Sequence, residues 1–152
     1  MKIIATLILT VLFISCHKKE TFDKPKDTDT IVTMNQITTN YDTLIKRVKC
    51  KGDIDAYDEM FFSFMDSNEA ERTDSLMIYS KIMAEKYHNK KAYLDYFVAL
   101  CEKYNVHVDY SNYSTINLSK MESFSKKQAE DWLKKMLEKK VITQEQYNSV
   151  QR

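Results

Sequence analysis

The chain has 152 residues but only one glycine and one proline, and this scarcity constrains the fold more than any other feature. Glycine supplies the positive φ angles of tight hairpin turns, and proline fixes the backbone of many other turns. A chain with so few turn residues is poorly suited to joining many short strands. The composition therefore predicts an all-α protein, and the length suits one domain with a core of its own.

Apolar residues recur at helical spacing, and two of these segments match at an offset of 36 residues. Residues 55–65 (DAYDEMFFSFM) align with residues 91–101 (KAYLDYFVALC), and a weaker copy covers residues 128–140 with Ala129 in the alanine position. The side chains expected to be buried are Ile54, Tyr57, Phe61, Phe64 and Met65 in the first copy, and Ala92, Tyr93, Tyr96, Phe97, Leu100, Cys101 and Tyr104 in the second.

Two further helices are predicted before these copies. Their apolar faces are Tyr41, Leu44, Ile45 and Val48 for one helix, and Leu76, Tyr79, Met83 and Tyr87 for the other. Asp74 or Thr73 is the expected N-cap of the second helix, and His88-Asn89 its end. We expect antiparallel helix pairs over residues 35–152, stacked into a short right-handed solenoid with one irregular insert.

Ala92, Tyr96 and Ala99 follow a small–x3–aromatic–x2–small pattern, which resembles the second helix of the tetratricopeptide-like family of αα-repeats. Ala84 and Tyr87 resemble positions of that family's first helix. Ala84 to Ala92 spans eight residues, however, where the family normally has twelve. The resemblance covers residues 35–104 and implies protein or peptide binding rather than catalysis.

The insert comprises residues 106–119 (VHVDYSNYSTINLS), which lack helical spacing and predict an irregular loop. Tyr110 and Tyr113, beside Asp109 and Asn112, combine rigid aromatic rings with adaptable polar groups, a composition suited to partner binding. The alternative is that both tyrosines fold back and cover the end of the helix that carries Ala92.

A long helix is predicted after the insert, over residues 122–139, with Ser125 or Ser123 as its N-cap. Thr143 should cap a short closing helix. Cys50 and Cys101 would lie about 22 Å apart along stacked parallel copies, too far for a disulfide, so we expect two free thiols with Cys101 buried in the position equivalent to Met65.

The N-terminus predicts an export signal, because Lys2 precedes a charge-free segment that is too short to span a bilayer. Phe13-Ile14-Ser15-Cys16 at its end resembles the lipobox of bacterial lipoproteins. This resemblance implies removal of residues 1–15, acylation of Cys16 and anchoring in a membrane. An ordinary secretory signal followed by a chance cysteine is the alternative.

Residues 16–34 contain the single proline and no apolar periodicity, so they are expected to form a tether. His17 stands where many inner-membrane lipoproteins carry Asp, which favours the outer membrane of a Gram-negative bacterium. Thr30, in an Asp-Thr-apolar sequence within this tether, is a candidate for O-glycosylation.

Charge and motif content argue against several other functions. Without Lys2 the chain would have 22 basic and 22 acidic residues, which gives no reason to expect nucleic acid. The histidines His17, His88 and His107 lack the spacing of a metal site, and one glycine is too few for phosphate-binding loops. Asp53, Asp55, Asp58 and Glu59 suggest the first turn of a helix more than acid–base chemistry. No cofactor, metal or enzymatic activity is expected.

The sequence therefore predicts a lipid-anchored, helical-repeat module that binds another envelope or secreted protein, in an accessory or immunity-type role. A structural spacer without a specific ligand and a small envelope hydrolase are the alternatives.

Overall fold

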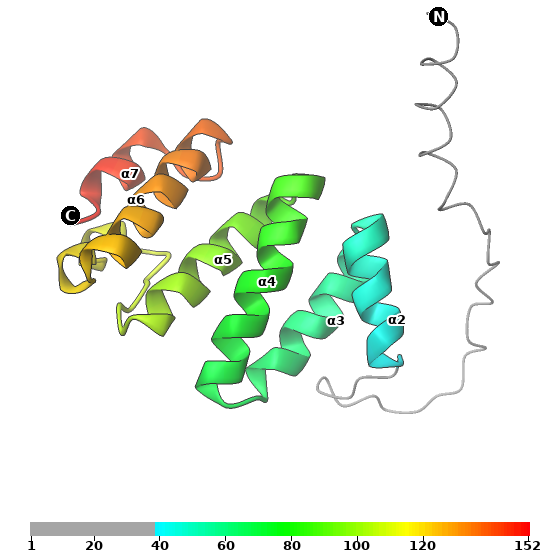
Figure 1. Cartoon of the computed structure of the whole chain (residues 1–152). Helices are drawn as coiled ribbons and strands as arrows, with labels where there is room; N and C mark the ends of the chain where they lie inside the picture. Colours follow the sequence, from blue (N-terminus) through cyan, green and yellow to red (C-terminus); the bar gives the residue numbers. More distant parts are fainter. Residues whose placement is uncertain (1–38) are drawn as a thin grey trace, which may run out of the picture. The chain divides into compact units, whose positions relative to one another are not determined.

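The computed structural model describes residues 39–152, and these form an all-α domain (Figure 1). Its elements, in chain order, are α2 (Tyr41–Lys46), the π-helical turn η2 (Arg47–Lys51), α3 (Ile54–Met65), α4 (Glu69–Tyr87), α5 (Lys90–Lys103), the 3₁₀ turns η3 (Tyr113–Thr115) and η4 (Leu118–Lys120), α6 (Ser123–Glu138) and α7 (Gln144–Ser149). Each α-helix packs against the next along the chain, and the contact between α4 and α5 is the most extensive.

The single glycine ends the first helical segment. Gly52 has a φ of 63°, in the left-handed region that side chains with a Cβ rarely adopt. A Cβ at this position would lie 2.3 Å from the ring of Tyr87, so both the backbone conformation and the space require glycine. The Tyr87 hydroxyl donates a hydrogen bond to the Lys49 carbonyl at 2.8 Å, which ties this end of η2 to the end of α4.

The helices α3 and α5 begin in the same way. The side chain of Asp53 accepts a hydrogen bond from the Ala56 N–H at 3.1 Å, and that of Asn89 accepts one from the Ala92 N–H at 3.1 Å. The two caps are therefore 36 residues apart, like the aligned segments that follow them. Ala56 and Ala92 are both fully buried, so the offset seen in the sequence extends to the caps and the packed alanines.

The expected apolar stripe of α3 is partly wrong. Tyr57 and Phe64 are buried as predicted, but Ile54 is 56% exposed and Met65 is 41% exposed. The face that packs inward is instead Ala56, Tyr57, Met60 and Phe64. The stripe of α5 is confirmed from Ala92 to Cys101, where every predicted position is buried.

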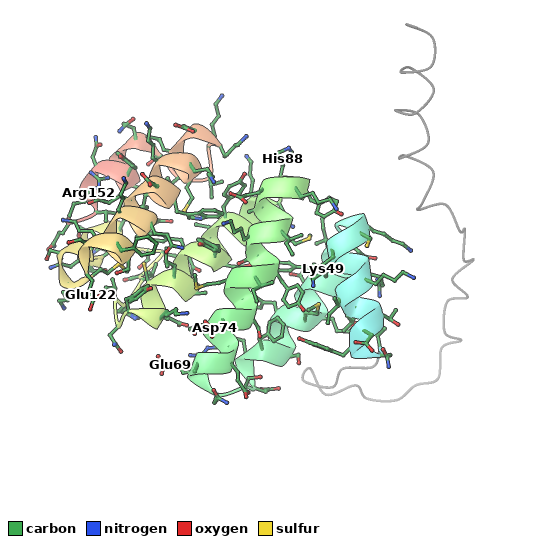
Figure 2. The ribbon with its side chains drawn as sticks, in the orientation of Figure 1. Lys49, Glu69, Asp74, His88, Glu122 and Arg152 are labelled. Carbon is green, nitrogen blue, oxygen red and sulfur yellow. The ribbon has the colours of Figure 1, made fainter. Side chains whose placement is uncertain are left out.

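The start of α4 also differs from the prediction. Asn68, not Asp74 or Thr73, caps the helix by accepting a hydrogen bond from the Glu71 N–H at 3.1 Å. Thr73 is buried inside α4, and Asp74 instead pairs with Lys103 of α5 at 2.7 Å. At the other end, His88 adopts a left-handed conformation and ends α4 as predicted, at the turn into α5 (Figure 2).

The insert is irregular, as predicted, but it contains two 3₁₀ turns and contributes to the core. Tyr113, Ile116 and Leu118 are all buried. Asn117 forms an isolated parallel bridge with Gln151, which holds the insert beside the C-terminus. The segment therefore covers hydrophobic surface over part of its length.

Of the N-caps predicted for the last two helices, the first is wrong and the second is confirmed. Helix α6 begins after Glu122, and neither Ser123 nor Ser125 caps it; Ser125 is buried and donates to the Glu122 carbonyl at 3.0 Å. Helix α7 begins with the predicted Thr143 cap, which forms a reciprocal capping box with Gln146.

Cys101 is buried as predicted, Cys50 is exposed, and both are free. The position equivalent to Cys101 is Met65, which is exposed, so the two copies differ at this point. Among residues 39–152, no helix is long and apolar enough to cross a membrane. The predicted signal (residues 1–15), the acylated Cys16, the tether (residues 16–34) and Thr30 lie outside the described residues.

Candidate functional site

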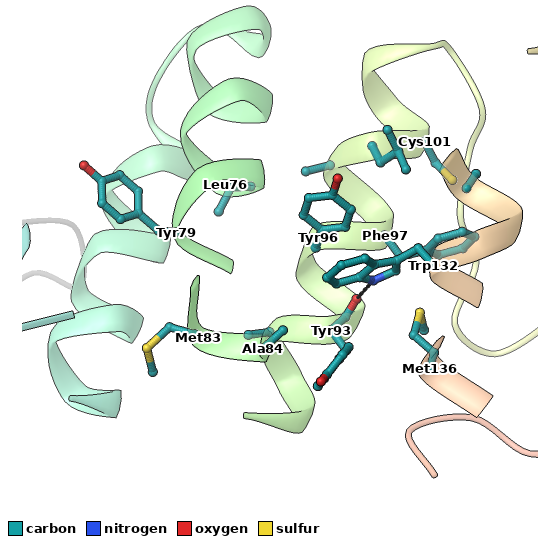
Figure 3. Close-up of a cluster of buried hydrophobic side chains, with 14 of the residues drawn as sticks. Leu76, Tyr79, Met83, Ala84, Tyr93, Tyr96, Phe97, Cys101, Trp132 and Met136 are labelled. Atoms are coloured by element: carbon teal, nitrogen blue, oxygen red, sulfur yellow. Dashed lines mark hydrogen bonds between the residues drawn. The ribbon is translucent and has the colours of Figure 1, made fainter. Parts of the chain in front are cut away.

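The candidate site is built on the contact between α5 and α6, where the only tryptophan is buried (Figure 3). The Trp132 ring lies 3.9 Å from the ring of Tyr96 and 5.6 Å from that of Tyr93, measured between ring centroids. Its Nε1–H donates a hydrogen bond of 2.9 Å to the Tyr93 carbonyl. The indole is therefore held by both apolar contact and a directed bond, which fixes α6 on α5.

A cleft of ≈ 430 Å³ lies above this aromatic cluster, between α4, α5 and α6. Its lining residues are Lys81 and Glu85 from α4, Tyr96 from α5, and Phe124, Lys127, Gln128, Asp131, Trp132 and Lys135 from α6. Tyr96 and Trp132 are almost fully buried, so they form the floor. Phe124 is 81% exposed, and the cleft therefore combines a buried aromatic floor with an unusually exposed aromatic wall.

The register of two helices explains why these side chains converge. Phe124, Gln128, Asp131 and Lys135 recur at spacings of three and four residues, which places them on one face of α6. Lys81 and Glu85 are four residues apart and share a face of α4. Trp132 is one helical step beyond Asp131, so its ring lies toward α5 and forms the floor of the cleft, while Asp131 lies at the exposed side.

Polar contacts close part of the cleft and leave other groups available. Lys135 Nζ pairs with Glu85 Oε1 at 2.5 Å and joins α6 to α4. Gln128 donates a hydrogen bond to the Tyr96 hydroxyl at 2.7 Å. In the part of the chain that the structure describes, Lys81, Lys127 and Asp131 make no side-chain hydrogen bond or ion pair. Charges without partners are thus placed around an aromatic surface.

This arrangement suits recognition. Its aromatic rings supply apolar contact area, and the unpaired lysines can attract carboxylates. A segment of another protein with one large apolar side chain and nearby acidic groups would complement both features.

A second polar cluster is buried between α3 and α5. Asp95 is 6% exposed and accepts hydrogen bonds from the Tyr57 hydroxyl at 2.8 Å and from Lys91 Nζ at 3.0 Å. Burial raises the pKa of Asp95 above its ordinary value, although the bonds from Tyr57 and Lys91 act in the opposite direction. Lys91 Nζ also lies 3.3 Å from Asp58 Oδ1, a buried oxygen that forms no hydrogen bond. Because Asp95 on α5 accepts a hydrogen bond from Tyr57 on α3, this cluster joins α3 and α5.

The four predicted partner-binding residues of the insert do not share one environment. Tyr113 is 6% exposed and covers the core, as the alternative interpretation expects. Tyr110 is 49% exposed, and partial burial raises the pKa of its hydroxyl. Asp109 accepts bonds from Ser111, and Asn112 accepts bonds from Ser114, so both side chains shape the local turns. Binding through Tyr110, Asp109 and Asn112 stays a prediction.

The acidic residues at the start of α3 have the structural roles that their positions suggest. Asp53 caps the helix and pairs with Arg47 at 2.8 Å. Partial burial raises the pKa of Asp53, but the bonds from Arg47 and the Ala56 N–H outweigh it and leave that pKa below its usual value. Glu59 accepts a hydrogen bond from the Thr39 N–H at 3.2 Å. Within residues 39–152, no group of three or more His, Cys, Asp or Glu side chains is placed to hold a metal ion.

The cleft is not evident from the sequence, because its lining residues form no unusual pattern there. Phe124 precedes the apolar stripe of α6, and its exposure depends on where α6 docks. The sequence does contain one indication of a binding surface, because Phe124 lies near the charged Lys127 and Asp131. An aromatic residue on a charged helix face is not needed for the core.

Comparison with protein-family models, with curated protein sequences and with solved structures gives no match to this chain.

Proposed function

We propose that the chain is a lipid-anchored protein of the bacterial cell envelope whose helical domain binds a segment of another envelope or secreted protein in the α4–α5–α6 cleft. The observation that carries the binding proposal is Phe124, an 81% exposed aromatic side chain beside the Tyr96–Trp132 floor. Large exposed aromatic residues next to pockets are typical of binding surfaces.

Chemistry in the cleft supports a partner segment of a particular kind. An apolar side chain inserted between Phe124 and Trp132 would be desolvated on both sides. Lys81 and Lys127 would then lie close enough to the cleft to attract acidic groups of the same segment. The Lys135–Glu85 ion pair holds the two walls together, so the surface exists before the partner arrives.

The proposed architecture is a short right-handed solenoid of divergent tetratricopeptide-like helix pairs. In this proposal α2 with η2 pairs with α3, and α4 pairs with α5. The equivalent caps Asp53 and Asn89, followed by the buried Ala56 and Ala92, support the repeat. Helix α6, which carries the third copy, would then be the second helix of a third pair whose first helix is replaced by the insert.

The proposed anchor is diacylglycerol-modified Cys16, with residues 16–34 as the tether. Replacement of Cys16 by serine should abolish incorporation of labelled lipid and release the protein from the membrane or leave it uncleaved. Unchanged membrane fractionation without any lipid label on the wild type would refute the lipoprotein proposal.

The binding proposal can be tested by photo-crosslinking in cells. A photoreactive amino acid at position 124 should form a discrete adduct with one partner protein, whereas the same amino acid at Lys134, exposed on α6 but outside the cleft, should not. Lys127→Glu should weaken the interaction with that partner by about 5- to 10-fold, with Lys134→Glu as the matched control.

The outcomes separate the competing functions. Equal adducts at both positions would exclude the cleft as the binding site. Adducts at Tyr110 alone would move the site to the insert, and none at any position would favour the spacer. Turnover in a substrate panel would favour the hydrolase. Neighbouring reading frames distinguish the two binding roles, because a toxin next door supports immunity and a transporter or protease supports an accessory function.

A further inference from the structure

We propose that the outer face of α3 is a second docking surface, distinct from the cleft, and that it binds a basic amphipathic helix of another protein. Ile54, Phe62 and Met65 are 56%, 54% and 41% exposed. Their spacing of eight and then three residues places them on one face of the helix, away from the buried Ala56–Met60–Phe64 face. We call Ile54, Phe62 and Met65 the α3 ridge.

The ridge has a defined aromatic centre. The ring of Phe62 meets that of Phe61 edge to face, with 5.7 Å between centroids. Phe61 is itself half-buried and lies beneath Lys91, whose Nζ is 3.8 Å from the ring centroid. The Phe61 ring therefore contacts both Lys91 and Phe62, and it supports the exposed Phe62 ring.

The length and shape of the ridge fit a helix. Ile54 to Met65 spans about 17 Å along the axis of α3, which corresponds to three turns of a partner helix. A narrow apolar stripe on a helix is complemented by a second helix with apolar residues at i, i+3 or i+4 and i+7. An extended strand would find no free backbone partner here, because the backbone groups of α3 are bonded within the helix.

The charge of the surface around the α3 ridge indicates which kind of partner helix would bind. From Asp53 to Glu71 the chain carries seven acidic residues and no lysine or arginine, and Arg47 and Lys91 from neighbouring segments pair with two of the seven, Asp53 and Asp58. Asp55 lies next to Ile54 at the start of the ridge and has no side-chain partner within the described residues. A partner helix with lysines or arginines beside its apolar stripe would meet opposite charges along this surface. An acidic helix would be repelled.

The probe is a fluorescent peptide of about 18 residues with leucines on one helical face and lysines on the others. Its binding to residues 17–152, the chain without the predicted signal and the predicted acylated cysteine, is followed by anisotropy at physiological ionic strength. We expect saturable binding that weakens about 10-fold in Phe62→Ser and in Ile54→Ser. A scrambled peptide of the same composition and a leucine–glutamate peptide should not bind measurably.

The matched control is Ile78→Ser. Ile78 is 54% exposed, almost the same as Ile54, but it lies on α4, three residues before the cleft residue Lys81. It should leave peptide binding unchanged. Asp55→Asn should weaken binding about two- to three-fold and reduce its dependence on salt, and circular dichroism confirms that each variant is folded.

Three results would overturn the proposal. Equal binding of the scrambled peptide or equal loss in Ile78→Ser would show that the contact is not made by the ridge. Peptide binding that appears only after residues 17–38 are removed would assign the ridge to the chain's own N-terminal segment. Concentration-dependent dimers abolished by Phe62→Ser, without peptide binding, would assign it to a second copy. Crosslinking at position 124 is independent of all three.

Discussion

Trp132 allows the docking of α6 on α5 to be tested quantitatively. Truncation to alanine removes a side chain that is 5% exposed and makes two aromatic contacts, so it should destabilise the domain by about 3–5 kcal/mol. Trp132→Phe keeps most of the ring burial and loses the bond to the Tyr93 carbonyl. That carbonyl still accepts within α5, so the expected loss is only about 1–2 kcal/mol.

These free energies convert into separable melting temperatures. For a domain of about 110 residues, the unfolding entropy is roughly 0.23 kcal/mol/K, so 1 kcal/mol corresponds to about 4 °C. Trp132→Phe should therefore lower Tm by about 4–8 °C and Trp132→Ala by about 12–20 °C. Thermal denaturation followed by far-UV circular dichroism measures both, with denaturant unfolding as a check on the free energies.

The control lies on the same helix. Phe124→Ala removes an aromatic side chain of similar size that is 81% exposed, and it should change Tm by no more than about 2 °C. If Trp132→Phe were as damaging as Trp132→Ala, the ring contacts would not be the source of the stability. If Trp132→Ala changed Tm no more than Phe124→Ala does, α6 would not be docked on α5 through this residue.

Three further predictions concern single positions. Under native conditions, a thiol reagent should modify the exposed Cys50 and spare Cys101, because Cys101 is buried and burial raises its pKa to about 12; mass spectrometry of early modification at Cys101 would contradict this. Gly52→Ala should destabilise the domain by at least about 1–2 kcal/mol, because its φ is positive and the new Cβ meets the Tyr87 ring; an unchanged Tm would contradict the geometry. The pKa of Asp95 is raised on folding, so its ionisation opposes folding as pH rises from the ordinary Asp value through the folded pKa. The stability of Asp95→Asn relative to the wild type should therefore increase over that pH range and then level off, and denaturant melts that show a constant difference would exclude this.

The sequence was sufficient to predict the helices because local rules determine most of them. Thr143 has the residues of a capping box three positions apart, and the box forms. The α5 stripe around Tyr96 packs against both α4 and α6, so every predicted position from Ala92 to Cys101 is buried, and only Tyr104 at the end of the helix is partly buried. Scarce glycine and proline correctly predicted an all-α domain, and the one glycine lies where a positive φ is required.

The predictions that are wrong concern positions where several residues have the same local preference and tertiary contacts determine which of them is used. Asn68, Thr73 and Asp74 can all cap a helix, and only packing of Thr73 into the core removes it from that role. The single stripe predicted for α3 likewise combined residues of two faces, and only the packing of the other helices determines which face is covered. Asp95 is a further case, because aspartate is usually exposed, but here the carboxylate is buried and accepts hydrogen bonds from Tyr57 and Lys91.

Although the net charge is near zero, acidic and basic residues are concentrated in different parts of the chain, and each part contains one of the two proposed surfaces. Acidic residues dominate from Asp53 to Glu71, whereas residues 120–140 contain seven lysines and only four acidic residues. Attraction between molecules would therefore favour contact between the α3 ridge of one chain and the α6 region of another, where Phe124 is the exposed apolar residue. The proposed binding of other proteins would require this contact between copies to be weak. Lys126 pairs with Glu130, and Lys135 with Glu85, so part of the α6 charge is already neutralised within the chain. These pairs lower the attraction between copies while Lys81 and Lys127 stay available at the cleft, which is the arrangement expected if each surface serves a different protein.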